Sequence, residues 1–160
     1  MSLRYLLPED RAALRALLTG CFGGPARADL LDGLRDAGDM PLELVWVEGL
    51  AIQGYLGFAR HQSPAGWWSL ATLAVHPRRK KRGIEDELIR QGLDLARQNR
   101  AKAVTVVGDP AWFRRFGFSD VAAQNLVTPP HPGQTLLYAI RPGMAGVTAD
   151  LTYPAGLPLA

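Results

Sequence analysis

The succession of segments between residues 67 and 107 constrains the fold more than any other feature of the sequence. Trp67 to Val75 is a long apolar stretch, which predicts a strand that ends before Pro77. Apolar residues then recur at helical spacing from about Gly83 to Asn99, and Ala103 to Val107 is a short apolar run typical of a strand buried on both faces. A helix of about sixteen residues between two strands favours a parallel β-α-β crossover. The sequence therefore predicts a sheet with at least one parallel pair of strands.

The remaining segments extend this pattern on both sides. Further strands are predicted at residues 3–7, 42–47, 51–60 and 135–140, and further helices at residues 8–20, 28–37 and 110–116. The order is β-α-α-β-β-β-α-β-α-β, which indicates a mixed α/β (α+β) sheet flanked by helices. Three prolines predict a loop at residues 128–133, and the last fifteen residues predict a tail with room for one short strand.

Length and composition indicate one folded domain over residues 1–160. An apolar content of 48% is enough for a core without disulfides, and the one cysteine, Cys21, can form none within the chain. Cys21 is expected to be a small, buried apolar residue. No apolar run approaches the roughly 20 residues that span a bilayer, and the N-terminus shows no secretory segment. We therefore expect a cytoplasmic protein with no membrane partner.

The net charge of +3 comes from one short segment. Residues 78–82 read Arg-Arg-Lys-Lys-Arg, and without these five the chain holds 13 bases and 15 acids. A nucleic-acid-binding domain usually spreads positive charge over a whole face. Nucleic-acid binding is therefore the weakest of the three functions that we consider, and we expect no nucleic-acid partner. A single basic patch fits one compact anion better.

The segment from Leu73 to Ile84 has the features of a phosphate-binding loop. A buried strand ends at a proline, a basic loop follows, and Gly83 opens a helix. Free N–H groups at a helix start bind anions, and the helix dipole adds to this. The segment lacks the lysine-serine/threonine ending of a P-loop and the three glycines of a dinucleotide fingerprint. The residues alone therefore predict a phosphate or pyrophosphate site.

Two motifs carry a more specific resemblance. Leu-Ala-Val-His-Pro at residues 73–77, followed by the basic loop and Gly83-Ile84, resembles the acetyl-CoA motif of the GNAT N-acetyltransferase family. Residues 107–118 and the tail at 142–154 resemble a bacterial branch of predicted acetyltransferases, the YhbS-like branch. The resemblance covers most of the chain. It implies the GNAT acyl-CoA N-acyltransferase fold, with a central mixed sheet splayed between the strands that end at Val75 and begin near Ala103.

The resemblance also implies a function and its residues. The function is acetyl transfer from acetyl-CoA, a co-substrate, to the amine of a small-molecule or peptide acceptor. In the family, loop and helix-start amides hold the pyrophosphate, here around Lys81 to Asp86, and strand amides near Leu73 and Val75 meet the acetyl carbonyl and pantetheine. The implied acetyl-CoA-binding residues are Leu73, Ala74, Val75, Lys80, Lys81, Arg82, Gly83, Ile84, Glu85 and Phe113.

Glu85 departs from the family, which has glycine or alanine at this position; Lys80, in place of glutamine or arginine, is a milder change. At 100° per residue the apolar half of the helix holds Ile84, Leu88, Ile89, Gly92, Leu93, Leu95 and Ala96. Glu85 falls in the middle of this half, so its carboxylate is predicted to point towards the cofactor or the core. The alternative is an ordinary helix-start acid, favoured by the dipole.

Two further departures concern catalysis. Many relatives have a tyrosine general acid where this chain has Phe113, and a glutamate base where it has Ala71. The catalytic residues are therefore unknown, and water would have to carry the proton of the amine. A second hypothesis follows: a catalytically degenerate GNAT-fold protein that binds or senses acyl-CoA. The sequence leaves monomer and homodimer open.

The aromatic and histidine residues carry weaker signals. His61, His76 and His131 show no metal-ligand spacing, so no metal is expected. Trp67 and Trp68 are adjacent on one predicted strand, so only one of them is expected to face inward. The aromatic residues of the second motif fit the core at least as well as a cofactor contact; they are Trp112, Phe113, Phe116 and Phe118.

Overall fold

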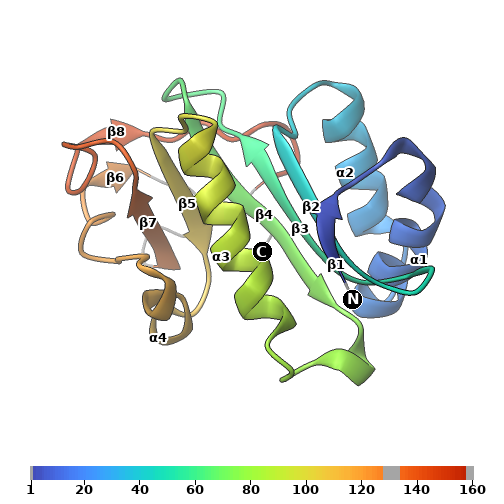
Figure 1. Ribbon diagram of the computed structural model, residues 1–160. Helices are drawn as coiled ribbons and strands as arrows, with labels where there is room; N and C mark the ends of the chain where they lie inside the picture. Colours follow the sequence, from blue (N-terminus) through green and yellow to red (C-terminus); the bar gives the residue numbers. More distant parts are fainter. Residues whose placement is uncertain (1, 128–133, 158–160) are drawn as a thin grey trace. The chain divides into compact units, whose positions relative to one another are not determined.

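The structure is a computed structural model, and it describes residues 2–127 and 134–157. Within these residues a six-stranded sheet has the order β1-β2-β3-β4-β5-β7, and β6 pairs with β8 (Figure 1). The strands are β1 Ser2–Tyr5, β2 Leu42–Glu48, β3 Ala51–Arg60, β4 Trp67–Val75, β5 Ala103–Val107, β6 Leu126–Val127, β7 Thr135–Ala139 and β8 Ala149–Asp150. The α-helices are α1 Arg11–Phe22, α2 Ala26–Asp36, α3 Ile84–Gln98 and α4 Pro110–Phe113, with 3-10 turns η1 Pro8–Asp10, η2 Pro77–Arg79 and η3 Arg114–Phe116. The predicted loop at 128–133 lies outside the described residues, as does His131.

The predicted parallel strand pair is present. β4 and β5 run parallel, with Trp67 opposite Ala103 and Ser69 opposite Thr105. β1 with β2, β2 with β3, and β5 with β7 are antiparallel. The sheet is therefore mixed, as the sequence predicted.

The chain divides into two compact units. The first holds Met1–Phe58 and Thr72–Leu93, and the second holds Ala59–Ala71 and Asp94–Ala160. The division passes through β3, β4 and α3. The single domain predicted over residues 1–160 stays a prediction.

In the first unit, helices cover both faces of the strands. Leu56 and Phe58 of β3 contact α3 at Gly92, where an added Cβ would lie 3.1 Å from each side chain. Tyr55 is adjacent to Leu56 and so faces the other side, where its hydroxyl donates to Glu43 at 2.7 Å. Arg35 of α2 donates to the same carboxylate at 2.9 Å. The predicted apolar face of α3 is confirmed, since Leu95 is half-buried and all its other members are buried.

The pair formed by Arg35 and Glu43 holds α2 against β2. Burial alone would lower the pKa of Arg35, but the hydrogen bond and charge of Glu43 raise it above its usual value. Burial and the Glu43 carboxylate likewise raise the pKa of Tyr55, so its phenol stays neutral and donates. A buried pair of this kind depends on both partners, because removal of one leaves an uncompensated charge.

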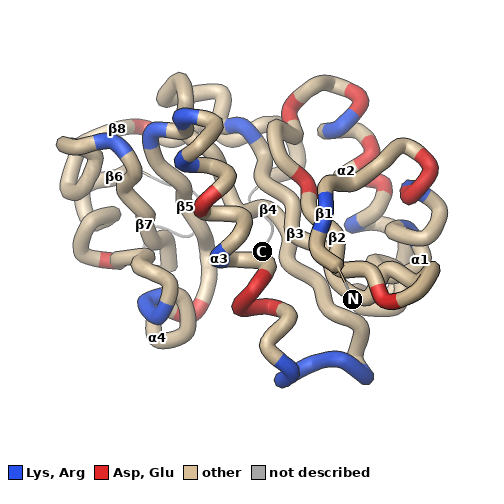
Figure 2. The backbone as a smooth tube through the Cα atoms, in the orientation of Figure 1, with Lys and Arg blue, Asp and Glu red and all other residues tan. Residues whose placement is uncertain are grey.

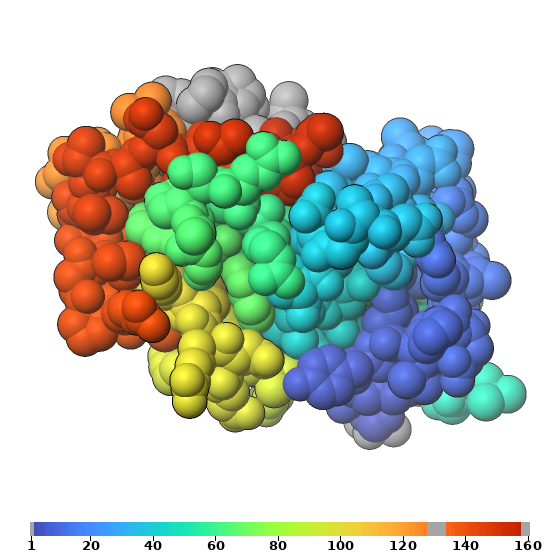
Figure 3. All heavy atoms as spheres, turned by 90° about the horizontal axis from the view of Figure 1, so that it is seen from above, coloured from blue at the N-terminus to red at the C-terminus, as the bar shows by residue number. Residues whose placement is uncertain are grey.

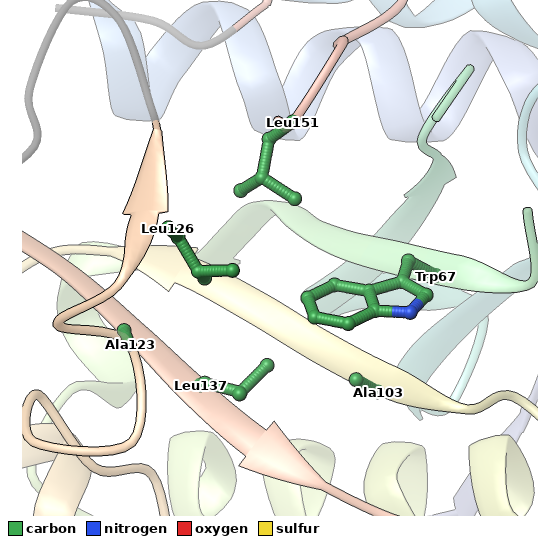
Figure 4. Packing of buried hydrophobic residues seen from close by; sticks show 6 residues of the cluster. All are labelled: Trp67, Ala103, Ala123, Leu126, Leu137 and Leu151. Atoms are coloured by element: carbon green, nitrogen blue, oxygen red, sulfur yellow. The ribbon is translucent and has the colours of Figure 1, made fainter. Parts of the chain in front are cut away.

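The second unit is built around Trp67. Figure 4 shows the indole of Trp67 with the side chains of Leu126, Leu137 and Leu151 pointing towards it. Trp68 is also buried, with exposed fractions of 2% for Trp67 and 5% for Trp68. The expectation that only one of the two faces inward was therefore wrong. Neighbouring side chains do point to opposite faces, but both faces of β4 are covered at this point.

The C-terminal segment belongs to the core of this unit. Thr152 exchanges backbone hydrogen bonds with Ser63, at 2.8 Å and 3.3 Å, and Leu151 and Tyr153 pack into the Trp67 cluster. Figure 3 shows this segment, in red, alongside the green connection between β3 and β4. β8 fits the short strand predicted for the tail, whereas its two-residue partner β6 was not predicted.

His61 is a buried polar residue of the second unit. Its Nε2 lies 2.7 Å from the Thr105 hydroxyl, and its ring meets that of Tyr153 at 4.5 Å between centroids. Burial lowers the pKa of His61 from 6.5 to about 4. The folded protein therefore keeps this imidazole neutral at pH values where the unfolded chain binds a proton.

This pKa predicts acid sensitivity of the fold. Between pH 6.5 and pH 4 the unfolded chain binds the His61 proton and the folded chain does not, so stability falls as the pH falls. The contribution of His61 is on the order of 3 kcal/mol. Urea unfolding of the protein and of His61→Gln should show a flatter pH dependence in the variant over this range. Equal slopes would contradict the prediction.

Candidate functional site

A pocket of about 170 Å³ lies in the first unit, at the end of β4. Its walls come from the end of α1, the last residues of β4, the basic loop and the first turn of α3. The lining residues are Cys21, Phe22, Leu73, Ala74, Val75, Lys80 and Glu85. The pocket therefore brings the predicted phosphate-binding segment together with α1, which ends at Phe22, far earlier in the chain.

The chain leaves β4 through a tight turn. The N–H of His76 donates to the carbonyl of Gln53 at 2.8 Å, which holds this point against β3. The N–H of Arg79 then donates to the His76 carbonyl at 2.7 Å, and the N–H of Arg78 donates to His76 Nδ1 at 3.1 Å. Pro77 cannot donate to a sheet ladder and starts η2. These bonds determine where the basic loop begins.

Two residues with positive φ connect η2 to α3. Lys81 has φ 63° and Gly83 has φ 84°. The Gly83 carbonyl accepts the N–H of Glu87 at 3.1 Å, so this is the first hydrogen bond of the helix. The N–H groups of Ile84 and Glu85 precede it and have no acceptor within the helix. With no side chain at Gly83 to cap them, they can bind an anion.

The basic run is adjacent to an acidic helix start (Figure 2). Arg79 is held by Glu48, with 2.8 Å between Nε and Oε2, and this pair lowers the pKa of the Glu48 carboxyl. Arg79 therefore connects the loop to β2. The other four basic residues of the run are exposed; they are Arg78, Lys80, Lys81 and Arg82.

Glu85 is half-buried and lines the pocket together with Lys80. This position agrees with the direction predicted from the helical periodicity. Among the described residues, the Glu85 carboxylate has no ion-pair partner within 4.0 Å. The pocket therefore holds an acid and a base that do not neutralise each other in a direct pair.

Cys21 and Phe22 are pocket residues that sequence reasoning missed. Cys21 was expected to be a buried apolar residue, but it is half-buried, and its Sγ donates to the Val75 carbonyl at 3.5 Å. Burial raises the pKa of the Cys21 thiol, and the charge of Lys80 partly opposes this. No pattern near residue 21 indicates these contacts, because they depend on how α1 packs.

The ten predicted site residues fall into four groups. Five line the pocket: Leu73, Ala74, Val75, Lys80 and Glu85. Lys81, Arg82 and Gly83 lie in the exposed loop, and Ile84 is buried beside Gly54 of β3. Phe113 lies in the second unit, where its ring meets those of Trp112 at 4.9 Å and Phe118 at 5.7 Å. Its predicted contact with acetyl-CoA stays a prediction.

Comparison with known proteins decides the family. The profile of the Acetyltransferase (GNAT) family matches residues 11–118. The uncharacterized N-acetyltransferase YhbS of Escherichia coli K12 is 34% identical over 131 residues, which cover 79% of this chain and 78% of YhbS. The chain belongs to the GNAT acetyltransferase family. The family that the two motifs indicated is thereby confirmed.

Solved structures of GNAT proteins share the fold. YhbS from Escherichia coli, crystallised in complex with CoA, superposes with a TM-score of 0.87 and 29% identity over 96% of this chain and 89% of that one. A GNAT acetyltransferase from Brucella melitensis, in complex with acetyl-CoA, superposes with a TM-score of 0.82 and 26% identity over 96% of each chain. The predicted fold class is confirmed.

Two other properties concern the described residues alone. None of their helices combines the length and apolar character needed to cross a membrane. In residues 2–127 and 134–157, no three His, Cys, Asp or Glu side chains are grouped so as to hold a metal ion.

The geometry of Gly83 generates a prediction. Nothing lies within 4 Å of a Cβ added at Gly83, so Gly83→Ala causes no clash, and its effect on stability comes only from the positive φ. We expect it to lower the free energy of unfolding by about 1 kcal/mol, and Gly83→Asn by less, since asparagine adopts this conformation more readily. Urea unfolding measures both. Gly20→Ala is the control, because Gly20 lies inside α1 with open space and an ordinary φ, so alanine should stabilise there. No loss of stability in Gly83→Ala would contradict the account.

Proposed function

We propose that the protein transfers the acetyl group of acetyl-CoA to the amine of an acceptor molecule. The observation that carries the proposal is the pocket at the end of β4, which opens beside uncapped helix amides and exposed bases. Membership of the GNAT family supports acetyl transfer, and two similar GNAT structures hold CoA or acetyl-CoA. A small-molecule or peptide acceptor, a cytoplasmic location and a monomer or homodimer are part of the same proposal.

The proposed binding mode follows the order of the chain. The amides of residues 81–86 would hold the pyrophosphate, because such groups at a helix start lack intrahelical acceptors. Lys80 and the exposed bases around it add positive charge. Leu73, Ala74 and Val75 would line the path of the pantetheine and the thioester along β4.

The proposed reaction uses no side chain as a general acid or base. A neutral amine attacks the thioester carbonyl, a C–N bond forms, the C–S bond breaks and the thiolate leaves. Ala71 and Phe113 cannot exchange a proton, so water takes the proton of the amine and supplies the one that the thiolate gains. The protein contributes position and a polarised carbonyl. A binding or sensing role remains the second hypothesis, and turnover of any amine excludes it.

Cys21 offers a direct test of the cofactor site, because it lines the pocket and is the one cysteine of the chain. Bound acetyl-CoA should slow alkylation of Cys21 by N-ethylmaleimide, about tenfold at ten times Kd, as mass action requires. Mass spectrometry of the labelled protein gives the rate. Neutralising Arg78, Lys80, Lys81 and Arg82 together should weaken this protection, whereas Arg79 is left unchanged because it holds Glu48. An unchanged alkylation rate with acetyl-CoA would refute the site.

Glu85 should weaken the binding of acetyl-CoA. A carboxylate at roughly 4–5 Å from a pyrophosphate in a partly shielded site repels it by a few kcal/mol, part of which the basic run offsets. We expect Glu85→Gly and Glu85→Gln each to tighten binding about tenfold, or about 1.4 kcal/mol, in calorimetric titrations. Glutamine removes the charge without the helix penalty of glycine.

The matched control is Glu87→Gln, which makes the same charge change on the exposed side of the same helix turn. It should alter the affinity for acetyl-CoA much less. Equal affinities of the protein and both Glu85 variants would show that this carboxylate does not face the ligand. Weaker binding in the variants would show that Glu85 orders the loop.

A further inference from the structure

Arg27 lies next to the pocket without being part of its lining. It is in the first turn of α2, and its Nη1 donates to the hydroxyl of Thr72 at 3.2 Å. Its guanidinium carbon lies 4.0 Å from the centroid of the Phe22 ring. Phe22 lines the pocket, and Thr72 directly precedes Leu73, another lining residue. Both contacts are within the first unit.

Three features make this position unfavourable for a cation. The side chain is half-buried, and burial lowers the pKa of Arg27 below its ordinary value. The first turn of α2 is the positive end of the helix dipole, which repels a positive charge. Among the described residues, the guanidinium has no carboxylate partner.

The acids closest to Arg27 in the chain already pair with other arginines. Asp29 pairs with Arg15 at 2.9 Å, and Asp32 pairs with Arg15 at 2.6 Å. Asp36 pairs with Arg11 at 3.2 Å. The α2 carboxylates therefore do not compensate the charge of Arg27.

The contacts that Arg27 does make hold it in place. The ring of Phe22 supports the plane of the guanidinium, and Thr72 accepts one of its five N–H donors. A planar group held in this way is prepared for a second partner that accepts two parallel hydrogen bonds, which is the geometry of a carboxylate. An unpaired, partly desolvated charge costs free energy, so a partner from outside the chain would explain its presence.

We propose that Arg27 binds a carboxylate group of the acceptor, so that the acceptors are amines that also carry a carboxylate, such as amino acids and their derivatives. The inference rests on the proposed function, which places the thioester along β4 near Leu73. The phosphates of CoA are a less suitable partner. Thr72 lies three residues before Val75, so it is about 10 Å back along the strand from the end of β4, and the basic loop lies beyond that end.

The test compares matched pairs of amines. Each pair is an amino acid and its carboxamide, assayed with acetyl-CoA by release of the CoA thiol. The protein should favour the carboxylate member by about tenfold in kcat/KM, since a hydrogen-bonded charge pair is worth roughly that much. Arg27→Gln should remove the preference, and Arg27→Lys should retain part of it. Arg60→Gln is the control, because it removes an equal charge from an exposed position at the end of β3.

Two further measurements separate the possible outcomes. Calorimetry with acetyl-CoA should give the same Kd for the protein and Arg27→Gln, and thermal unfolding should show that the variant is folded. If Arg27→Gln loses affinity for acetyl-CoA and keeps the preference for carboxylate acceptors, the guanidinium binds a phosphate of CoA and the proposal is overturned. Equal activity on both members of every pair also overturns it.

If no amine of the panel reacts, the binding of reaction products is measured instead. N-acetylated amino acids and their amides are then titrated against the CoA-bound protein by calorimetry. Binding of the carboxylates that is lost in Arg27→Gln supports the proposal, and equal binding of acids and amides refutes it. Failure to bind acetyl-CoA at all would refute the proposed function instead, which calorimetry shows separately.

Discussion

Helix α3 can approach strand β3 closely because Gly54 and Gly92 carry no side chain where the two elements meet. A methyl group at Gly54 would lie 3.0 Å from Ile84, and one at Gly92 would lie 3.1 Å from Leu56, so the helix would have to move outwards. The first turn of α3 carries both the uncapped amides and Glu85. Packing inside the first unit therefore determines where the helix start stands relative to the end of β4.

The strand, loop and helix around the site could be predicted because neighbouring residues decide each of them. Pro77 ends the strand, Gly83 supplies the positive φ from which α3 begins, and a spacing of 100° per residue identifies the buried face of the helix. The direction of Glu85 follows from the same spacing. Two motifs at the right separation then identified the family, which local patterns alone do not name.

Contacts between distant segments could not be predicted in this way. Arg27 meets Thr72 across 45 residues, and Cys21 meets Val75 across 54, with nothing in the local sequence to indicate either contact. Alternation along β4 correctly predicts that Trp67 and Trp68 point to opposite faces of the sheet. It does not show that other parts of the protein bury both faces. Strand β6 is two residues long, too short for any periodicity.

The place of the C-terminal segment in the second unit has a consequence for the order of assembly during synthesis. Every residue of the first unit, including the whole pocket lining, has been translated once the ribosome passes Leu93. The cluster around Trp67 needs Leu151 and Tyr153, which lie far downstream of Trp67 in the chain. The core of the second unit is therefore complete only after this downstream segment has been made, when all the residues of the pocket already exist.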